Sequence, residues 1–340
     1  MKAFRPIFII LSAFSPFFTS WAQTGRSAYE FLNIPTSSHV FGLGGTNIAL
    51  IDDDVSMAQD NPALLGPEID KAASISYMRY FGSANFAGIR YGMAAGDRAA
   101  WAVGIRYLNY GDIAAYQPDG SSAGSFSPSD MVFEGSYSHD FTDRLRGGIN
   151  IKLVYSSYER YSAFALASDI GLNYYDDDHD LSLSLVLKNM GGQLKRFEEK
   201  HDPLPFDIQL GFMKGLGESP FSFGITAFNL TKWNLPYYSH PQQSGNDAIE
   251  LKSSFGSNLF RHLIFCAQYM PSQQFYIDLA YNYKTRTDMS SYQRNFLSGF
   301  SAGLGIKVRS FSIGLAYAMP HKSASTILLN LGLGIGELLQ

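Results

Sequence analysis

Cysteine is almost absent from this chain of 340 residues, which contains only Cys266. A single cysteine excludes an intramolecular disulfide. Because Cys266 lies inside a strand-like run, it is interpreted as a small hydrophobic side chain rather than a reactive thiol. No cysteine lies near the N-terminus, which excludes a lipoprotein anchor.

Charged residues and long apolar runs are also scarce. Asp, Glu, Lys and Arg make up 16% of the chain, against about 25% in soluble globular domains. The formal net charge is -4, so no surface for nucleic acid is expected. Mean hydropathy is -0.07, and beyond the N-terminal region no run approaches the roughly 20 apolar residues of a spanning helix. A bundle of membrane helices is therefore excluded.

Aromatic residues are abundant, at 15%, and apolar side chains alternate with small or polar ones from about residue 73 onward. Near the end of the chain, for example, Leu329 and Leu331 alternate with Asn330 and Gly332. Successive side chains of a strand point to opposite faces, so each such run predicts a strand with one apolar and one polar face. Composition alone fits either a membrane barrel or a soluble β-sandwich.

Loop lengths decide between these two architectures. The predicted strands span residues 73–80, 85–93, 99–109, 130–140, 144–156, 162–174, 180–189, 205–214, 220–229, 259–270, 275–284, 296–308, 310–318 and 324–335. The connections at one end are tight, and most of those at the other end are longer, spanning residues 110–129, 190–204, 230–258 and 285–295. This asymmetry is typical of an outer-membrane barrel, with the short turns in the periplasm.

The sequence therefore predicts an all-β fold, a 14-stranded transmembrane antiparallel β-barrel with both termini in the periplasm of a Gram-negative bacterium. Residues 250–257 also alternate, but a fifteenth strand would make the strand number odd. They are assigned to an extracellular loop. The barrel must be closed because lipid offers no partner to unpaired backbone groups.

Two segments precede the barrel, which is assigned to residues 71–340. Residues 1–22 are typical of a signal peptide: Lys2 and Arg5 precede an apolar run, and Ser20 and Ala22 supply the small residues of a cleavage site. Residues 23–70 are predicted to lie in the lumen as a plug. Fourteen strands enclose an interior wider than that of an eight-stranded barrel, which side chains alone can fill.

Two motifs of the plug are candidate functional elements. The first contains Gly42, Gly44 and Gly45, and the second contains Asn61 and Pro62. The glycines are not followed by the Lys of a phosphate-binding loop. Tight packing of the plug backbone against the barrel wall is the predicted role of this motif.

The polar strand faces carry charged residues that are predicted to point into the lumen. On the lipid face, Arg or Lys near the midplane would cost about 2–4 kcal/mol. These residues are Arg79, Arg90, Arg106, Glu134, Arg146, Lys152, Asp169, Asp207, Asp278 and Lys307. A network satisfied within the lumen or with the plug is favoured over a substrate pathway.

The sequence shows no clustered nucleophile and base of an enzyme. The histidines form no His-x-x-x-His pair, and none of them sits in a Gly-x-Ser-x-Gly elbow. The acidic turns at residues 52–54 and 176–180 do not have the spacing of an EF-hand and are interpreted as solvated turns, with a cation site as the alternative. The protein is predicted to be non-enzymatic and to bind no cofactor or metal.

Aromatic residues near the predicted strand ends and in one loop suggest two further roles. Amphipathic rings favour membrane–water interfaces, so the tyrosines near strand ends predict aromatic girdles. They are Tyr107, Tyr110, Tyr155, Tyr158, Tyr161, Tyr174, Tyr175, Tyr281 and Tyr283. In the loop 230–258, Trp233, Tyr237 and Tyr238 are the predicted anchors for a partner, because Trp and Tyr dominate interface energetics. Membership of the upper girdle is the alternative for these three residues.

Several segments of the chain resemble the PorQ family. The first spans residues 25–35 and contains the more specific Tyr29-Glu30-Phe31-Leu32-Asn33-Ile34-Pro35; the others are residues 42–47, 53–56, 61–65, 261–265, 269–272 and 281–283. The likeness runs through essentially the whole mature chain. This family is an outer-membrane component of the type IX secretion system of Bacteroidota, and it is similar to PorV and, more distantly, to the FadL fatty-acid transporters.

The resemblance implies a FadL-like barrel that holds a surface attachment complex at the membrane. Its implied partners are a PorZ-like surface protein and, through it, PorU and PorV. That complex processes secreted cargo and joins it to lipopolysaccharide, and its peptidase chemistry belongs to PorU. The alternative function is a FadL-like transporter of a hydrophobic small molecule. A strand kinked inward near the plug, with apolar lumen residues beside it, would favour the transporter.

Overall fold

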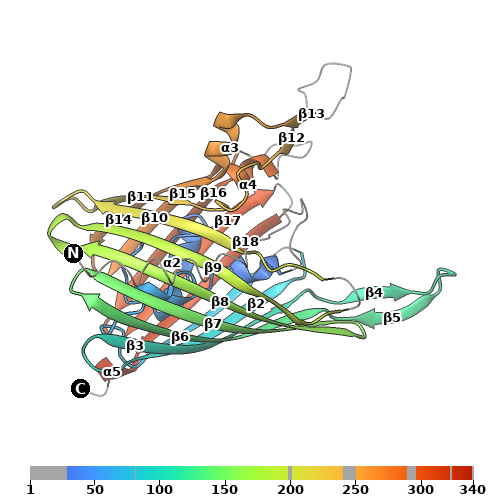
Figure 1. Cartoon of the computed structure of the whole chain (residues 1–340), viewed down its shortest axis with the longest axis horizontal. Coiled ribbons are helices and arrows are strands. Elements are labelled where there is room, and N and C mark those ends of the chain that lie inside the picture. The colour runs from blue at the N-terminus through green and yellow to red at the C-terminus, as the bar shows by residue number, and fades with distance from the viewer. Residues whose placement is uncertain are drawn as a thin grey trace, which may run out of the picture.

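The computed structural model describes residues 29–80, 82–197, 201–239, 250–288, 296–321 and 324–338. The predicted signal peptide, residues 1–22, lies outside these ranges. Within them, fourteen strands form one closed antiparallel barrel (Figure 1). Each strand pairs with its neighbours along the chain, and β1 pairs with β18 to close the sheet.

The barrel strands follow one another around the wall in chain order. They are β1 (Ala72–Arg79), β2 (Asn85–Ala94), β3 (Ala99–Asn109), β6 (Ser129–Thr142), β7 (Leu145–Tyr158), β8 (Tyr161–Asp176), β9 (Leu181–Lys195), β10 (Asp207–Gly215), β11 (Phe221–Ala227), β14 (Leu263–Ser272), β15 (Phe275–Asn282), β16 (Phe300–Val308), β17 (Phe311–His321) and β18 (Ala324–Gly334). The predicted fold class is confirmed, including the strand number and an N-terminal segment that is not part of the barrel.

Four of the described strands lie outside the barrel. The hairpin of β4 (Ile113–Tyr116) and β5 (Ser122–Phe126) lies in one long connection, and that of β12 (Tyr237–Ser239) and β13 (Glu250–Lys252) lies in another. Residues 250–257 are thus no barrel strand, as predicted. Strand β14 begins later than predicted because α3 (Phe255–Arg261) precedes it.

The long connections of the barrel all lie at one end, together with three short ones, whereas every connection at the other end is short. The short turns of that other end include η5 (Asp177–His179), and the end with the long connections carries both extra hairpins, α3 and α4 (Tyr283–Asp288). Ala72 pairs with Gly334, so the chain enters β1 and leaves β18 at the end with the short turns. Helix α5 (Ile335–Leu338) follows there. Assignment of this end to the periplasm stays a prediction.

The two faces of the wall have opposite character. Outward apolar side chains stay exposed along the strands, for example Ile89 at 54% and Leu331 at 51%. A broad apolar outer surface on a closed sheet fits a bilayer and would be unfavourable in water. No helix among the described residues is long and apolar enough to cross a membrane.

The charged residues of the strands point into the lumen, with one exception. Arg79 shares the outward face of β1 with Ile75 and Tyr77, so its predicted inward position is wrong. Arg79 is the last residue of β1. A charge near the interface costs only about 0–1 kcal/mol, and a long side chain can reach the head groups.

The N-terminal segment, drawn in blue in Figure 1, lies within the ring of strands. Its helices are short: η2 (Glu30–Asn33), α2 (Ser38–Gly42), η3 (Val55–Gln59) and η4 (Pro62–Leu64). Side chains cap three of them, because Ser37, Asp54 and Asn61 each accept a bond from a backbone N–H of the following helix. Residues 29–70 are called the plug below.

Candidate functional site

The contact between the plug and the wall is the candidate functional site. Plug side chains such as Leu32, Val40 and Leu43 are fully buried. Helix α2 packs against β15–β18, and η4 packs against β6–β8. The plug therefore bridges opposite sides of the lumen.

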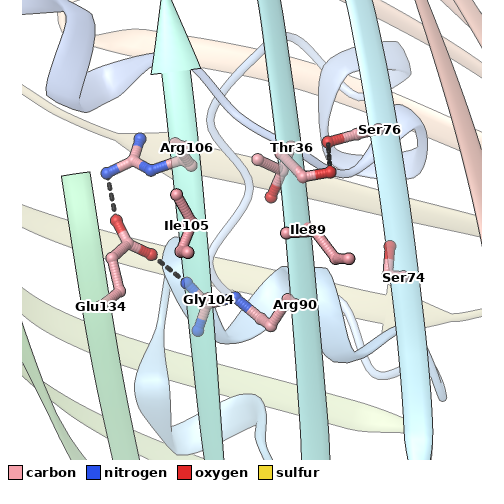
Figure 2. A pocket seen from close by; sticks show the side chains of 10 residues that line it. Thr36, Ser74, Ser76, Ile89, Arg90, Gly104, Ile105, Arg106 and Glu134 are labelled. Carbon is pink, nitrogen blue, oxygen red and sulfur yellow. Dashed lines mark hydrogen bonds and ion pairs between the residues drawn. The ribbon is translucent and has the colours of Figure 1, made fainter. Parts of the chain in front are cut away.

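A cluster of two arginines and one glutamate lies on neighbouring strands of the wall (Figure 2). Arg90 and Arg106 each donate to one carboxylate oxygen of Glu134, and all three side chains are buried. Arg106 also donates to the backbone carbonyls of Leu32 and Ile34, at 3.3 Å each. This cluster thus fixes the plug backbone through a charged donor.

A second polar cluster joins β9 to the plug. Lys188 Nζ lies 2.8 Å from Asp60 Oδ1, and both side chains are at most 2% exposed. Next to Lys188, Asn189 donates from its side chain to Asn33 Oδ1 at 2.9 Å and accepts from Lys152 Nζ at 2.8 Å. Lys152 in turn pairs with Asp169 at 2.6 Å. These buried charges of the lumen are therefore paired, as predicted for a satisfied network.

The strand β9 has a bulge at this position. Ser168 pairs with Met190 and Ile170 pairs with Leu187, so Lys188 and Asn189 together oppose Asp169. Asn189 has a φ of 57°, a left-handed conformation that asparagine tolerates better than most residues. Beyond the bulge the pairing of β9 with β10 ends, at Lys188 and Asp207.

The glycine motif of the plug lies against β14–β16. A Cβ on Gly42 would lie 2.7 Å from Gly303 Cα, and Ser301 Oγ donates to Gly42 O at 2.9 Å. Gly44 has a φ of +107°, and a Cβ there would lie 2.3 Å from the side chain of Ile264. Gly45 also has a positive φ but has open space around it. Close approach thus explains Gly42 and Gly44, and backbone conformation alone explains Gly45.

The second motif lies against β7–β9. Asn61 donates to Ser184 Oγ at 3.2 Å and to Ile48 O at 2.8 Å. Pro62 occupies the first turn of η4, and a Cβ on Gly148 would lie 2.5 Å from its carbonyl carbon. Both plug motifs therefore contact glycines or small residues of the wall.

The acidic turn at residues 52–54 is not a simple solvated turn, which corrects that interpretation. His39 Nδ1 lies 2.7 Å from Asp52, and Asp53 pairs with Lys307 of β16. Asp54 accepts from Ser37 Oγ at 2.7 Å. No cluster of His, Cys, Asp and Glu suited to a metal occurs among the described residues.

His39 is a buried, charged group of the plug. Its Nε2 faces Asp278 Oδ1 at 3.4 Å, and its ring stacks on Tyr276 with centroids 3.8 Å apart. Burial lowers the pKa of His39, but the carboxylates of Asp278 and Asp52 outweigh burial and raise that pKa to about 10. His39 is therefore protonated at neutral pH and forms an ionic contact between the plug and β15.

An apolar cluster at the loop end of the lumen was not anticipated from the sequence. Its buried members from the wall are Met78, Phe86, Leu108, Val132, Val154, Ala165, Ala167 and Leu328. The plug fills it with Tyr29, Phe31, Leu32 and Ile34, and Leu204 joins from the β9–β10 connection. The motif that opens the family resemblance thus provides the plug residues of this cluster.

Two of the predicted girdle tyrosines face inward. The hydroxyls of Tyr110 and Tyr158 both donate to Asp130, at 2.6 and 2.9 Å. Phe197 stacks on Tyr158 with centroids 4.9 Å apart. The predicted girdle role is wrong for these two tyrosines, because a buried carboxylate of β6 needs donors.

The three predicted docking anchors lie at the loop end of the barrel. Trp233 is 45% exposed and stacks on His262 with centroids 5.0 Å apart. Tyr237 lies under the guanidinium of Arg261, at 4.9 Å from its ring centroid. Tyr238 pairs with Leu251 in the β12–β13 hairpin. Their role in binding a partner stays a prediction.

A small cavity adjoins the arginine cluster. It is lined by Thr36, Ser74, Ser76 and the three charged side chains, and it measures about 10 Å³ (Figure 2). A volume of this size holds about one water molecule. It is too small for a hydrocarbon ligand.

Comparison with known proteins identifies the fold. No family model matches the chain, and no curated protein matches it. Among solved structures, the toluene transporter TbuX of Ralstonia pickettii is 12% identical, with a TM-score of 0.54 over 89% of this chain and 98% of its own. The toluene transporter TodX of Pseudomonas putida is 11% identical, with a TM-score of 0.53 over 90% and 98%.

A third similar structure is the monoaromatic hydrocarbon channel CymD, at 12% identity and a TM-score of 0.52 over 90% of this chain and 97% of its own. At such low identity the likeness concerns the fold. The chain therefore shares the barrel fold of these two transporters and this channel.

Proposed function

We propose that this protein is a non-enzymatic outer-membrane docking platform of the type IX secretion system. In this role it holds a PorZ-like surface protein and, through it, PorU and PorV, which join processed cargo to lipopolysaccharide. The observation that carries the proposal is the filled lumen, in which Lys188–Asp60, Lys307–Asp53 and the Arg106 contacts tie plug to wall. A plug fastened in this way suits a rigid platform.

Two hairpins at the loop end of the barrel are the proposed docking elements. The β4–β5 hairpin continues beyond the barrel in Figure 1 and carries Tyr116, which is 70% exposed. The β12–β13 hairpin carries the predicted anchors Tyr237 and Tyr238. An exposed tyrosine on a two-stranded ribbon, as at Tyr116, provides a large, rigid contact surface for a protein partner.

Site-specific crosslinking in intact cells tests the docking proposal. A photoreactive amino acid is placed at Tyr116 or Tyr237, and a matched control is placed at Ile89 on the lipid-facing wall. The expected result is a covalent adduct with a surface protein from the hairpin positions and none from Ile89. Recovery of no surface protein from either hairpin would contradict the platform.

A transporter of a hydrophobic small molecule is the second candidate, and the structural comparisons support it more directly than the first. The similar solved structures include two toluene transporters and a monoaromatic hydrocarbon channel. The bulge of β9 at Asn189 adjoins the plug, and the apolar cluster around Phe31 and Leu204 lies in the lumen. These features match the strand irregularity and apolar lining that such a transporter needs.

Uptake of radiolabelled toluene into vesicles that contain the purified protein separates the two candidates. A transporter accelerates uptake above that of empty vesicles, and Phe31→Trp, which adds volume to the apolar cluster, slows it. A platform leaves uptake at the level of empty vesicles, and the crosslinks at Tyr116 remain.

A further inference from the structure

Helix α3 has its apolar side outside and its polar side inside. Phe255 is 72% exposed, Phe260 51% and Leu259 37%, whereas Asn258 and Arg261 are buried. With about 100° between successive residues, the three exposed apolar side chains share one side of the helix. A helix on a water-facing surface shows the reverse arrangement, so the outward side of α3 is not suited to water.

The polar side of α3 is satisfied within the protein. Arg261 pairs with Asp288 at 2.5 Å, donates to Thr287 and covers the ring of Tyr237. Asn258 Nδ2 donates to Asn234 Oδ1 at 3.2 Å. These contacts hold the polar side of α3 against the protein, so its apolar side must face outward.

The outward side of α3 continues the lipid-facing surface of the barrel. Phe265, Tyr281 and Phe300 lie opposite one another on β14, β15 and β16 and form an outward aromatic row. The ring of Phe260 lies 6.4 Å from that of Phe265, and Phe296, 80% exposed, lies 6.3 Å from Phe300. Aromatic rows of this kind mark the level of the head groups in membrane barrels.

We infer that α3 rests in the head-group region of the surrounding bilayer and binds lipid. The binding surface consists of Trp233, Phe255, Leu259 and Phe260, called the α3 patch; Trp233 joins it through a ring distance of 5.7 Å to Phe255. A short amphipathic element with Trp and Phe on its apolar side buries that side at the boundary of head groups and acyl chains.

This lipid contact assigns Trp233 to the membrane and not to a protein partner. Lipid is favoured because the α3 patch is continuous with the lipid-facing row, and because its exposed members are Trp, Phe and Leu without a charged residue. In Figure 1, α3, α4 and the β12–β13 hairpin lie together at the ends of β14 and β15. The lipid contact would therefore hold this hairpin close to the membrane surface, whichever of the two functions applies.

Fluorescence of Trp233 tests the lipid contact. The chain has three tryptophans, and Trp21 lies in the predicted signal peptide, so Trp101→Phe leaves Trp233 alone in the mature protein. The mature protein is purified from membranes and placed in phosphatidylcholine vesicles whose acyl chains carry a nitroxide either near the head group or near the chain end. A water-exposed control replaces Tyr116 with Trp after removal of Trp101 and Trp233.

The expected result is stronger quenching of Trp233 by the shallow nitroxide than by the deep one, with weak quenching by aqueous iodide. The Tyr116→Trp control should be quenched by iodide and by neither lipid. Iodide quenching of Trp233 equal to that of the control would overturn the inference. So would loss of lipid quenching when the protein is taken with a co-purified partner, since the partner would then cover the α3 patch.

Discussion

Removal of one partner of the Lys188–Asp60 pair provides a severe test of the fastened plug. In Lys188→Met, the Asp60 carboxylate keeps its charge but loses its cation, while Asp60 Oδ2 already has no hydrogen-bond partner among the described residues. Breaking a buried ion pair costs about 3–5 kcal/mol, because one charge is left uncompensated. This corresponds to a roughly hundredfold to few-thousandfold shift toward a displaced plug.

The displaced plug should be visible as conductance. A lumen of fourteen strands is wide enough for ions once it is empty, so single channels of Lys188→Met in planar bilayers should open more often than those of the unaltered protein. The accompanying loss of stability is measured by urea titration, in which the folded fraction is read as a separate band when unheated samples are run on a gel.

A matched double variant separates charge from packing. In Asp60→Leu with Lys188→Met both charges are absent, and replacement of a buried pair by apolar residues is often neutral or stabilising. Conductance should therefore return toward that of the unaltered protein. If Lys188→Met stays closed and unfolds at the same urea concentration, the ion pair does not hold the plug and the reasoning fails.

Three further predictions concern the plug. Gly42→Ala should lower the unfolding free energy by about 1–3 kcal/mol in urea titrations, because the added Cβ would lie 2.7 Å from Gly303 Cα. Gly135→Ala is the control and should leave stability unchanged, because no atom lies within 4 Å of a Cβ there. The pKa of His39 is raised from 6.5 to about 10 in the folded protein. Its contribution to stability is therefore complete below about pH 6.5 and is lost as pH rises through about 10. His39→Asn should flatten this decline of the unfolding free energy with pH, and an unchanged slope would contradict the prediction. Phe31→Ala should cost about 3–5 kcal/mol of unfolding free energy because Phe31 is buried in the apolar cluster, and a change below about 1 kcal/mol would show that the cluster collapses around the gap.

The barrel could be predicted from the sequence because its physical rule is local. In a strand that spans lipid, apolar and polar side chains must alternate with period two. Leu329 and Asn330 can therefore be assigned to opposite faces without knowledge of any other strand. Strand ends are less determined. The predicted strand 259–270 includes residues 259–261, which belong to α3, and the contacts of Asn258 and Arg261 with other segments hold this helix in place.

The site was less predictable, since its contacts join residues far apart in the chain. The inward direction of Lys188 follows from the alternation of β9, but its pairing with Asp60 needs the path of the plug. The apolar cluster was missed because Met78, Phe86 and Leu108 each look like single exceptions within polar strand faces. A search for apolar residues on the polar face of adjacent strands at matching register would have found it.

The polar side chains of the wall satisfy the backbone of the irregular plug. A chain of short turns leaves many backbone carbonyls without helix or sheet partners, and a buried carbonyl without a donor is unfavourable. The wall supplies these donors from several sides: Arg106 to Leu32 and Ile34, Asn330 to Thr36 at 3.2 Å, Ser301 to Gly42, and Ser138 to Leu65. Because these bonds end on backbone atoms, the plug can change side chains and keep its path as long as the wall keeps its donors. Substitution of wall donors should therefore loosen the plug more than substitution of exposed plug side chains such as Ile51.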